Sequence, residues 1–279
     1  MNTEVSGQPE AGKQWSWSGG NGALVWQLMF GNDTVMGIKR FPEQRKASLF
    51  CLEASTGRVL CDDFVLTHKS GEDEVLVGDG WMIGLETVHG GLLFCHTYQP
   101  GSPEHQGIWA VDLAAGRVAW SRPDLVFTAN LGDALLTYRS LVFAGFPERD
   151  YWLVDPETGR ELEHFGTAHE RPNQLRDAAQ SEEAWQGILL PDAALDEAGH
   201  VERIALGATS VTVRHRMKSG AEGVPGWVAT LSVRAGDRLV HEAVMAAGEP
   251  MPVFNGFLMK DKRLYYIKER EVLVSLEVS

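Results

Sequence analysis

The alternation of apolar and polar residues along this chain is typical of short β-strands separated by turns. Runs such as residues 92–95, 210–214 and 264–267 are rich in aliphatic, aromatic or β-branched side chains and are bounded by turn residues. Residues 172–187 differ, because Leu175, Ala178 and Ala179 recur at roughly helical spacing among good helix formers. The pattern therefore predicts an all-β fold with a short helical insert near residues 170–190.

Three segments of the chain align with one another without gaps. Each contains an apolar run, a turn with a glycine and a returning run: residues 49–60 (LFCLEASTGRVL), 108–120 (IWAVDLAAGRVAW) and 151–162 (YWLVDPETGREL). Asp112 and Asp155 can accept backbone N–H groups in the turn, and the glycines supply a positive φ. Each segment is therefore predicted to be a strand, a turn and a returning strand of one repeated unit.

The spacing of the turn glycines predicts the number of these units. Gly116 and Gly159 are 43 residues apart, about the length of one four-stranded propeller blade. The other intervals are longer. Residues 69–80 and 97–106, which lack strand periodicity, supply the excess before Gly116, and residues 166–200 supply the excess after Gly159. The same period leaves the last unit one strand short at the C-terminus. Trp15 and Trp17 lie where an N-terminal strand would complete that unit and close the ring.

We therefore predict one domain, residues 1–279, that is a five-bladed β-propeller of four-stranded antiparallel blades. The blades are expected at residues 24–64, 81–120, 127–165, 201–245, and 253–278 together with the N-terminal strand 13–18. The insert at 166–200 separates blades three and four, and we expect it to form a helix and a loop across one face of the ring. Two domains divided at this insert are the alternative.

The second repeat resembles the blade motif of the quinoprotein-like (PQQ-type) propellers. In that motif an aspartate, a turn glycine and a docking tryptophan recur, and Asp112, Gly116 and Trp120 match it. Cys61 and Glu163 stand where the other copies would have the tryptophan. The motif is structural, so the resemblance implies a fold and no chemistry.

Most of the chain is also similar to a small bacterial family of unknown function with propeller-like structure. The segments that carry this resemblance are residues 84–90 (GLETVHG), 103–109 (PEHQGIW), 185–191 (WQGILLP) and 263–268 (RLYYIK). The family has no established activity, so the resemblance implies no functional residues.

The acidic composition excludes some classes of partner. The formal net charge of −13 repels phosphate backbones and anionic lipid surfaces, so we expect neither nucleic acid nor membrane as a partner. Arg214, Arg216 and Lys218 form a local basic group with His215 between them. We interpret this group as the solvated face of a strand, with binding of a small anion as the alternative.

The cysteines and the N-terminus indicate a cytoplasmic protein. The three cysteines, Cys51, Cys61 and Cys95, have no CxxC spacing, which argues against a disulfide framework and against a structural zinc site. With Glu53 paired to Arg58, Cys51 and Cys61 are expected on opposite faces of their hairpin. The start of the chain lacks the apolar core of a secretory signal, and no apolar run is long enough to span a bilayer.

Candidate chemistry gathers around the second repeat. The candidate ligand-binding residues are Glu86, His89, His96, Tyr98, Glu104 and His105. Carboxylates and imidazoles serve acid–base chemistry or bind metals when folding brings them together, but no HxH or HExxH spacing occurs here. We place His89 and His96 on opposite faces of one strand, because seven residues separate them. The alternative is structural, with His96 capping a strand and His105 anchoring a loop.

The sequence thus favours a binding module over an enzyme. No GxSxG, GxGxxG or Walker sequence occurs, and we predict no cofactor and no metal. The leading hypothesis is a non-enzymatic binding or scaffolding propeller, for a protein or a small molecule that the sequence does not identify. The alternative is a glycosidase-like hydrolase with paired carboxylates in the central channel.

Overall fold

The computed structural model describes residues 14–71, 73–99, 101–196, 199–219 and 225–278. Antiparallel sheets dominate these residues and helices are few, so the prediction of an all-β protein is confirmed. The chain forms two compact units, one of residues Gly19–Gln186 and one of Met1–Ser18 with Gly187–Ser279. No helix among the described residues has the length and apolar character needed to cross a membrane.

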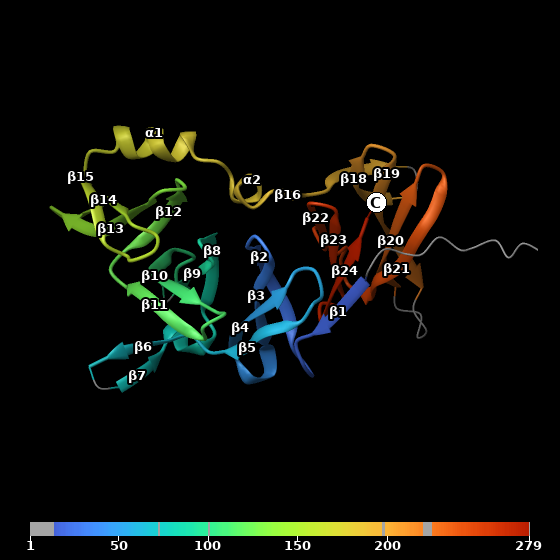
Figure 1. The fold of residues 1–279 in the computed structure, drawn as a ribbon, viewed down its shortest axis with the longest axis horizontal. Coiled ribbons are helices and arrows are strands. Elements are labelled where there is room, and N and C mark those ends of the chain that lie inside the picture. Colours follow the sequence, from blue (N-terminus) through green and yellow to red (C-terminus); the bar gives the residue numbers. More distant parts are fainter. Residues whose placement is uncertain (1–13, 72, 100, 197–198, 220–224, 279) are drawn as a thin grey trace, which may run out of the picture. The chain divides into compact units, whose positions relative to one another are not determined.

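The Gly19–Gln186 unit contains three four-stranded antiparallel sheets (Figure 1). The first consists of β2 (Leu24–Phe30), β3 (Thr34–Phe41), β4 (Lys46–Glu53) and β5 (Val59–Phe64). The second consists of β8 (Ile83–His89), β9 (Leu92–Tyr98), β10 (His105–Asp112) and β11 (Arg117–Arg122). The third consists of β12 (Val126–Asn130), β13 (Leu135–Phe143), β14 (Phe146–Val154) and β15 (Glu161–Gly166). In each sheet, strands that follow one another in the chain are neighbours.

The second sheet is apolar on both faces. Side chains alternate between the faces of a strand: Leu93 and Cys95 join a core with the first sheet, whereas Phe94 joins a core with the third. The indole of Trp120, at the end of this sheet, donates a hydrogen bond of 3.0 Å to the carbonyl of Pro156 in the third sheet's turn. That contact places the tryptophan of one repeat on the turn of the next.

A short hairpin and two 3₁₀ turns complete the connections in this unit. Strands β6 (Thr67–Ser70) and β7 (Asp73–Leu76) pair with each other, and the turns are η1 (Pro42–Gln44) and η2 (Val77–Gly80). The prediction that residues 69–80 lack strands is therefore wrong. All four residues of β7 are exposed, and Thr67 and His68 of β6 are only half-buried, so this hairpin leaves no apolar alternation in the sequence.

The pairing of the first hairpin also corrects a prediction. Cys51 and Cys61 are directly opposite each other on β4 and β5, so they share a face, and both are free. The register shifts between Cys51 and Leu52, and this β-bulge reverses the alternation expected from the turn. Burial raises the pKa of the Cys51 thiol to about 11, so the thiol is inert at neutral pH.

The helical insert forms two helices at the end of this unit. Leu175 of α1 (Glu170–Ala178) packs on the third sheet with Leu136 and Tyr151. Helix α2 (Glu182–Gln186) is bound to the first strands of two sheets, because Gln186 accepts a hydrogen bond of 2.6 Å from the amide of Phe30 and Trp185 donates one to β8. The helical part of the expected insert thus belongs to this unit, whereas Gly187 and the described residues that follow it belong to the other unit.

The remaining unit contains two five-stranded sheets. The fourth sheet consists of β17 (Asp192–Asp196), β18 (Gly199–Leu206), β19 (Thr209–Ser219), β20 (Pro225–Ala235) and β21 (Arg238–Glu249). The fifth consists, in spatial order, of β1 (Gln14–Ser18), β24 (Val272–Glu277), β23 (Arg263–Lys268), β22 (Phe257–Lys260) and β16 (Ile188–Leu189). The fourth sheet therefore starts before and ends after the expected residues 201–245, because it includes β17 and because β21 continues to Glu249. Both β17 and β16 of the fifth sheet lie within the segment assigned to the insert.

The N-terminal strand lies at the edge of the fifth sheet. β1 pairs antiparallel with β24, from Gln14 opposite Leu276 to Ser18 opposite Val272. Trp15 and Trp17 are both buried, whereas Lys13, the first residue of the predicted strand, lies outside the described residues. Strands from the two ends of the chain thus form one sheet.

Candidate functional site

Glu86 lies in a β-bulge on the second sheet. The register of β8 with β9 passes from Leu85 opposite Cys95 to Thr87 opposite Phe94, so Glu86 is the extra residue. A bulge re-aims its side chain relative to the regular alternation, and the Glu86 side chain is only 8% exposed. A second register shift, in β10, lies on the other side of β9. Polar side chains from three neighbouring strands meet at this place.

Two histidines approach the Glu86 carboxylate. Nδ1 of His105 makes a hydrogen bond of 2.7 Å with Oε1, and Nδ1 of His96 lies 2.9 Å from the same oxygen. The two imidazoles are stacked, with ring centroids 3.5 Å apart and planes inclined by 10°. One oxygen cannot lie in the planes of two parallel rings. Accordingly, both ring nitrogens of the buried His96 lack an aligned hydrogen bond among the described residues.

Gly84 and Tyr98 complete the surroundings of the His96 ring. Gly84 is opposite His96 on the neighbouring strand, and a Cβ at Gly84 would lie 2.4 Å from His96 Nε2. The Tyr98 ring meets His96 edge-on at 4.8 Å and His105 edge-on at 5.4 Å, a favourable aromatic geometry. Glu86, His96, Tyr98 and His105 are called the Glu86 cluster below.

The charges of the Glu86 cluster favour an ion pair. Burial alone raises the pKa of the Glu86 carboxyl, but its contacts with His105 and His96 outweigh burial and hold the pKa below its usual value. The hydrogen bond to Glu86 raises the pKa of His105 against the opposing effect of partial burial. Carboxylate and imidazolium therefore stabilise each other in mildly acidic solution.

The structure brings four of the six predicted residues together and places the other two elsewhere. His89, at the end of β8, has its ring stacked on Trp185 of α2 at 6.4 Å. Glu104 is exposed to solvent and precedes the first residue of β10. His89 and His96 belong to different strands, β8 and β9, so their assignment to one strand is wrong. Likewise, His96 lies within β9 and does not cap it.

Sequence reasoning missed Arg40, whose charge interacts with Tyr98. Its guanidinium lies over the rings of Trp26 and Trp81, 5.0 and 4.9 Å from their centroids, and donates a hydrogen bond of 3.0 Å to the Ile83 carbonyl. Burial lowers the pKa of Arg40. These residues come from separate segments, so no local motif in the sequence marks them. The one feature of the sequence that could have indicated Arg40 is an arginine within an apolar strand.

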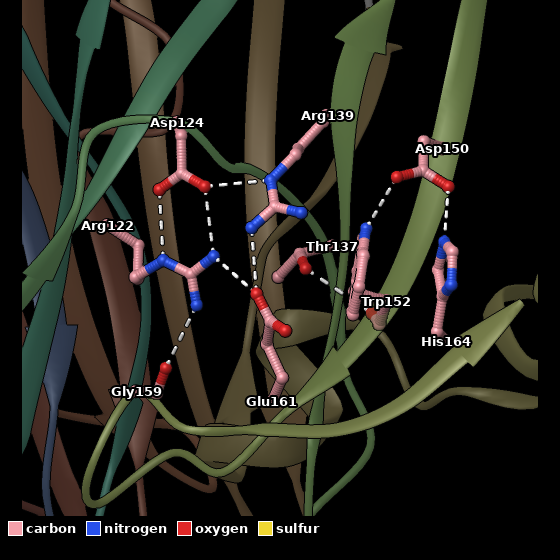
Figure 2. A network of polar contacts seen from close by, with 9 residues as sticks. All are labelled: Arg122, Asp124, Thr137, Arg139, Asp150, Trp152, Gly159, Glu161 and His164. Carbon is pink, nitrogen blue, oxygen red and sulfur yellow. Dashed lines mark hydrogen bonds and ion pairs between the residues drawn. The ribbon is translucent and has the colours of Figure 1, made fainter. Parts of the chain in front are cut away.

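A second polar network joins the end of the second sheet to the third (Figure 2). Arg122 and Arg139 each contact both Asp124 and Glu161, at distances of 2.7 to 2.9 Å. The hydrogen bonds from Arg122 and then Arg139 outweigh burial and hold the pKa of Asp124 well below its usual value. All four charges find partners within the network, which indicates a structural role.

Next to these ions, Trp152 is enclosed by polar groups (Figure 2). The Arg139 guanidinium lies 4.7 Å from its ring centroid, and the His164 ring stacks on it at 3.8 Å. Asp150 accepts a hydrogen bond of 2.8 Å from the Trp152 indole and makes one of 2.6 Å with His164. His164 thus has a carboxylate partner but no second histidine, unlike the Glu86 cluster.

Among the described residues, one group offers three close metal-ligating side chains. One ligand atom from each of Glu86, His96 and His105 lies within 4.8 Å of the others. Two imidazoles and a carboxylate suit divalent transition metals. The three residues belong to β8, β9 and β10. The prediction of no metal rested on the lack of short spacings such as HxH or HExxH, and ligands from separate strands do not have such spacings.

The fold and this cluster define an all-β protein of antiparallel sheets with a carboxylate–imidazole site. A family described as "Domain of unknown function (DUF4905)" matches residues 32–120, a stretch that contains the whole Glu86 cluster. The match ends at Trp120, so it leaves out the third, fourth and fifth sheets. No curated protein matches the chain.

Solved structures give weak similarities. BamB from Moraxella catarrhalis is 14% identical over 90% of this chain, with a TM-score of 0.26, and the chain spans 58% of that protein. A putative glycoside hydrolase from Bacteroides ovatus is 9% identical over 92% of this chain and 86% of its own, with a TM-score of 0.34. MPT-4, a mannose phosphorylase from Leishmania mexicana, is 10% identical over 93% of this chain and 85% of its own, with a TM-score of 0.27. None of these similarities transfers an activity to this chain.

Proposed function

We propose that this chain is a non-enzymatic binding module built from five propeller-type blades, and that the Glu86 cluster binds a divalent transition-metal ion such as Zn²⁺. The five sheets of four or five antiparallel strands support the blade count. The hydrogen bond from Trp120 to the turn of the next sheet also supports it, as does the pairing of β1 with β24. The cytoplasmic location expected from the sequence stays a prediction.

The observation that carries the metal proposal is that Nδ1 of His96 and Nδ1 of His105 both lie close to one oxygen of Glu86, at 2.9 and 2.7 Å. Zn²⁺ binds imidazole nitrogen at about 2.0–2.1 Å, and two such ligands at a tetrahedral angle lie about 3.3 Å apart. A shift of roughly 0.5 Å in the carboxylate would bring its oxygen to ligand spacing from each nitrogen. One of the two stacked rings would also have to rotate, because imidazole binds a metal in the plane of its ring.

His96 gives this proposal its second support. A buried polar atom without a hydrogen bond is costly, and the His96 side chain is 1% exposed with neither ring nitrogen satisfied among the described residues. Coordination through Nδ1 would satisfy one of them. His105 is 38% exposed, so the ion would retain a solvent-facing side where a small-molecule or protein ligand could complete its coordination.

Calorimetric titration with Zn²⁺ tests the proposal. The wild-type chain should bind one ion, with an affinity that falls below neutral pH because the imidazoles must lose their protons. His105→Ala should weaken binding by about 100-fold or more, since losing even a residue that only orients a ligand costs 10- to 100-fold. His164→Ala is the matched control, because His164 also contacts a carboxylate but outside the cluster. Equal losses in both variants, or no stoichiometric binding by wild type, would refute the metal proposal.

The alternative of a glycosidase-like hydrolase finds little support at this cluster. Hydrolysis of that kind uses two carboxyl groups about 5 to 9.5 Å apart, and the Glu86 cluster contains one. Glu182 of α2, which is partly buried, accepts hydrogen bonds from Thr87 and Gln186, and burial raises its pKa. We therefore propose binding as the function of the cluster.

A further inference from the structure

The fourth sheet has one apolar face and one polar face. Val211, Val213 and Leu231 lie in the core that this sheet shares with the fifth. Side chains alternate along a strand, so the residues between them point to the opposite face. On β19 these residues are Ser210, Thr212, Arg214, Arg216 and Lys218. Along β19, the side chains with hydroxyl groups are therefore followed by cationic side chains on the same face of the sheet.

The polar face contains a depression with a volume of about 350 Å³, within the range of small-molecule sites. Five cations line it, namely Arg203, Arg214, Arg216, Lys218 and Arg234, together with one carboxylate, that of Glu242. The whole chain carries a net charge of −13, so this surface is opposite in sign to the rest. Like charges repel one another, and an anion bound here would relieve that repulsion.

The strand register arranges these residues around a floor of hydroxyl groups. Thr212 is opposite Arg203 on one side and Ser232 on the other, and Ser232 is opposite Glu242. On the same face, the residue of β19 before Thr212 is Ser210, which is opposite Arg234. The residue after Thr212 on that face is Arg214, which is opposite Thr230. Residues opposite each other in a sheet are about 5 Å apart. Three arginines and one glutamate therefore surround four hydroxyl groups.

The guanidinium groups of Arg203, Arg216 and Arg234 are only partly used within the part of the chain that the structure describes. Arg203 and Arg216 are exposed and make no ion pair or side-chain hydrogen bond with other described residues. Arg234 donates one hydrogen bond, of 2.8 Å, to the carbonyl of Asp237. Five N–H donors on each guanidinium leave ample capacity for a ligand, so a purely structural role does not account for this arrangement.

We propose that this face binds a small phosphate monoester that also carries hydroxyl groups. Arginine forks match the geometry of phosphate oxygens and hold them by charge-assisted hydrogen bonds. Ser210, Thr212 and Ser232 can both donate and accept, which suits ligand hydroxyls as well as phosphate oxygens. Glu242 accepts hydrogen bonds only, so it favours a hydroxyl on its side of the site and disfavours a second phosphate there.

Titration calorimetry at low ionic strength with glucose 6-phosphate, inorganic phosphate and glucose as probes tests the proposal. We expect saturable binding of glucose 6-phosphate, weaker binding of inorganic phosphate and none of glucose. Arg203→Gln should weaken glucose 6-phosphate binding by about 10-fold or more, the effect of losing a hydrogen bond to a charged group. Arg238→Gln is the control, because Arg238 is an exposed arginine of the same sheet that does not line the depression.

Three results would overturn the proposal. The first is the lack of saturable binding of both phosphate probes at millimolar concentration. The second is an equal loss of affinity in the Arg203→Gln and Arg238→Gln variants, which would indicate nonspecific attraction. The third is a single-stranded oligonucleotide that binds more tightly than glucose 6-phosphate and depends on Lys218 but not on Arg203. Both substitutions lie on exposed side chains, and equal melting temperatures will show that the variants are folded.

Discussion

The indole of Trp120 lies on the turn glycine Gly159 of the following sheet. A Cβ at Gly159 would come within 2.7 Å of the indole ring, and the indole nitrogen donates a hydrogen bond to the carbonyl of Pro156 in the same turn. The edge of the indole also packs on Phe94, with ring centroids 5.7 Å apart. One residue thus ties the turn of the third sheet to the core between the second and third sheets.

Gly159→Ala should therefore destabilise the chain more than an ordinary turn substitution does. Gly116 is the matched control, because it occupies the same turn position with φ +64° against +71° at Gly159, but a Cβ there would meet nothing within 4 Å. Each alanine costs about 1–2 kcal/mol for its positive φ, and the clash with Trp120 should add about 1–3 kcal/mol. Urea denaturation of both variants measures the difference.

Equal destabilisation by the two alanines would show that Trp120 moves away at little cost. In that case the contact with Gly159 would not fix the third sheet against the second. A larger loss for Gly159→Ala that disappears in a Trp120→Ala background would establish the coupling directly, because a double-mutant cycle isolates the energy shared by two residues.

Much of the fold could be predicted because turn chemistry repeats at fixed offsets. Asp155 accepts hydrogen bonds from the amides of Glu157 and Thr158, as expected of an aspartate before a turn glycine. Asp112 does the same with the amide of Ala115. The strand at Trp15 and Trp17 followed from the length of the repeat. These features are local or periodic, so a single sequence contains them.

The candidate site could be predicted in composition but not in geometry. Glu86 reaches His105 because a bulge adds one residue to β8, and nothing in the sequence marks that residue as extra. The same limit explains the error at Cys51 and Cys61, where a bulge changes the register. Arg40 depends on contacts between separate strands. Packing in the folded chain determines where bulges form and which distant segments touch. A pattern of apolar residues along the sequence does not encode that packing.

Deleting residues 1–18 should cost substantial stability. The deletion removes β1, exposes the edge of β24 and abolishes the burial of Trp15 and Trp17. Loss of a single buried tryptophan side chain costs about 3–5 kcal/mol, so the melting temperature should fall steeply, and the unpaired edge should promote aggregation. A chain that starts at Gln14 is the control, since it keeps every pair between β1 and β24. Unchanged melting of the longer deletion would contradict this role of β1.

The Glu86–His105 pair should stabilise the fold most in mildly acidic solution. The pKa of Glu86 is lowered from 4.5, so its contribution is present above that value and is lost as the pH falls through the folded-state pKa. The pKa of His105 is raised from 6.5, so its contribution is complete below that value and is lost as the pH rises through the folded-state pKa. The two conditions overlap between about pH 4.5 and 6.5.

Comparison of wild type with His105→Gln across pH measures this contribution. The difference in melting temperature should be largest between about pH 4.5 and 6.5 and smaller on either side. His169→Gln serves as the control, because the His169 side chain is exposed and has no ion pair among the described residues. A difference that does not change with pH would show that packing of the His105 ring on His96, and not the ion pair, stabilises the cluster.

Asp124→Asn should weaken the network in Figure 2 by about 1 kcal/mol, because the carboxylate contacts both Arg122 and Arg139 but is 45% exposed to solvent. Salt screens exposed ions, and the Debye length in 1 M NaCl is roughly 3 Å. The loss of stability measured by urea denaturation should therefore be smaller in 1 M NaCl. The lowered pKa of Asp124 means that its contribution to stability persists below the usual pKa of an aspartate and disappears as the pH falls through the folded-state pKa.

Asp133→Asn is the control, because Asp133 is an exposed aspartate without a side-chain partner among the described residues, and it should change stability little. A loss that salt does not reduce would mean that Asp124 acts through hydrogen-bond geometry and not through charge.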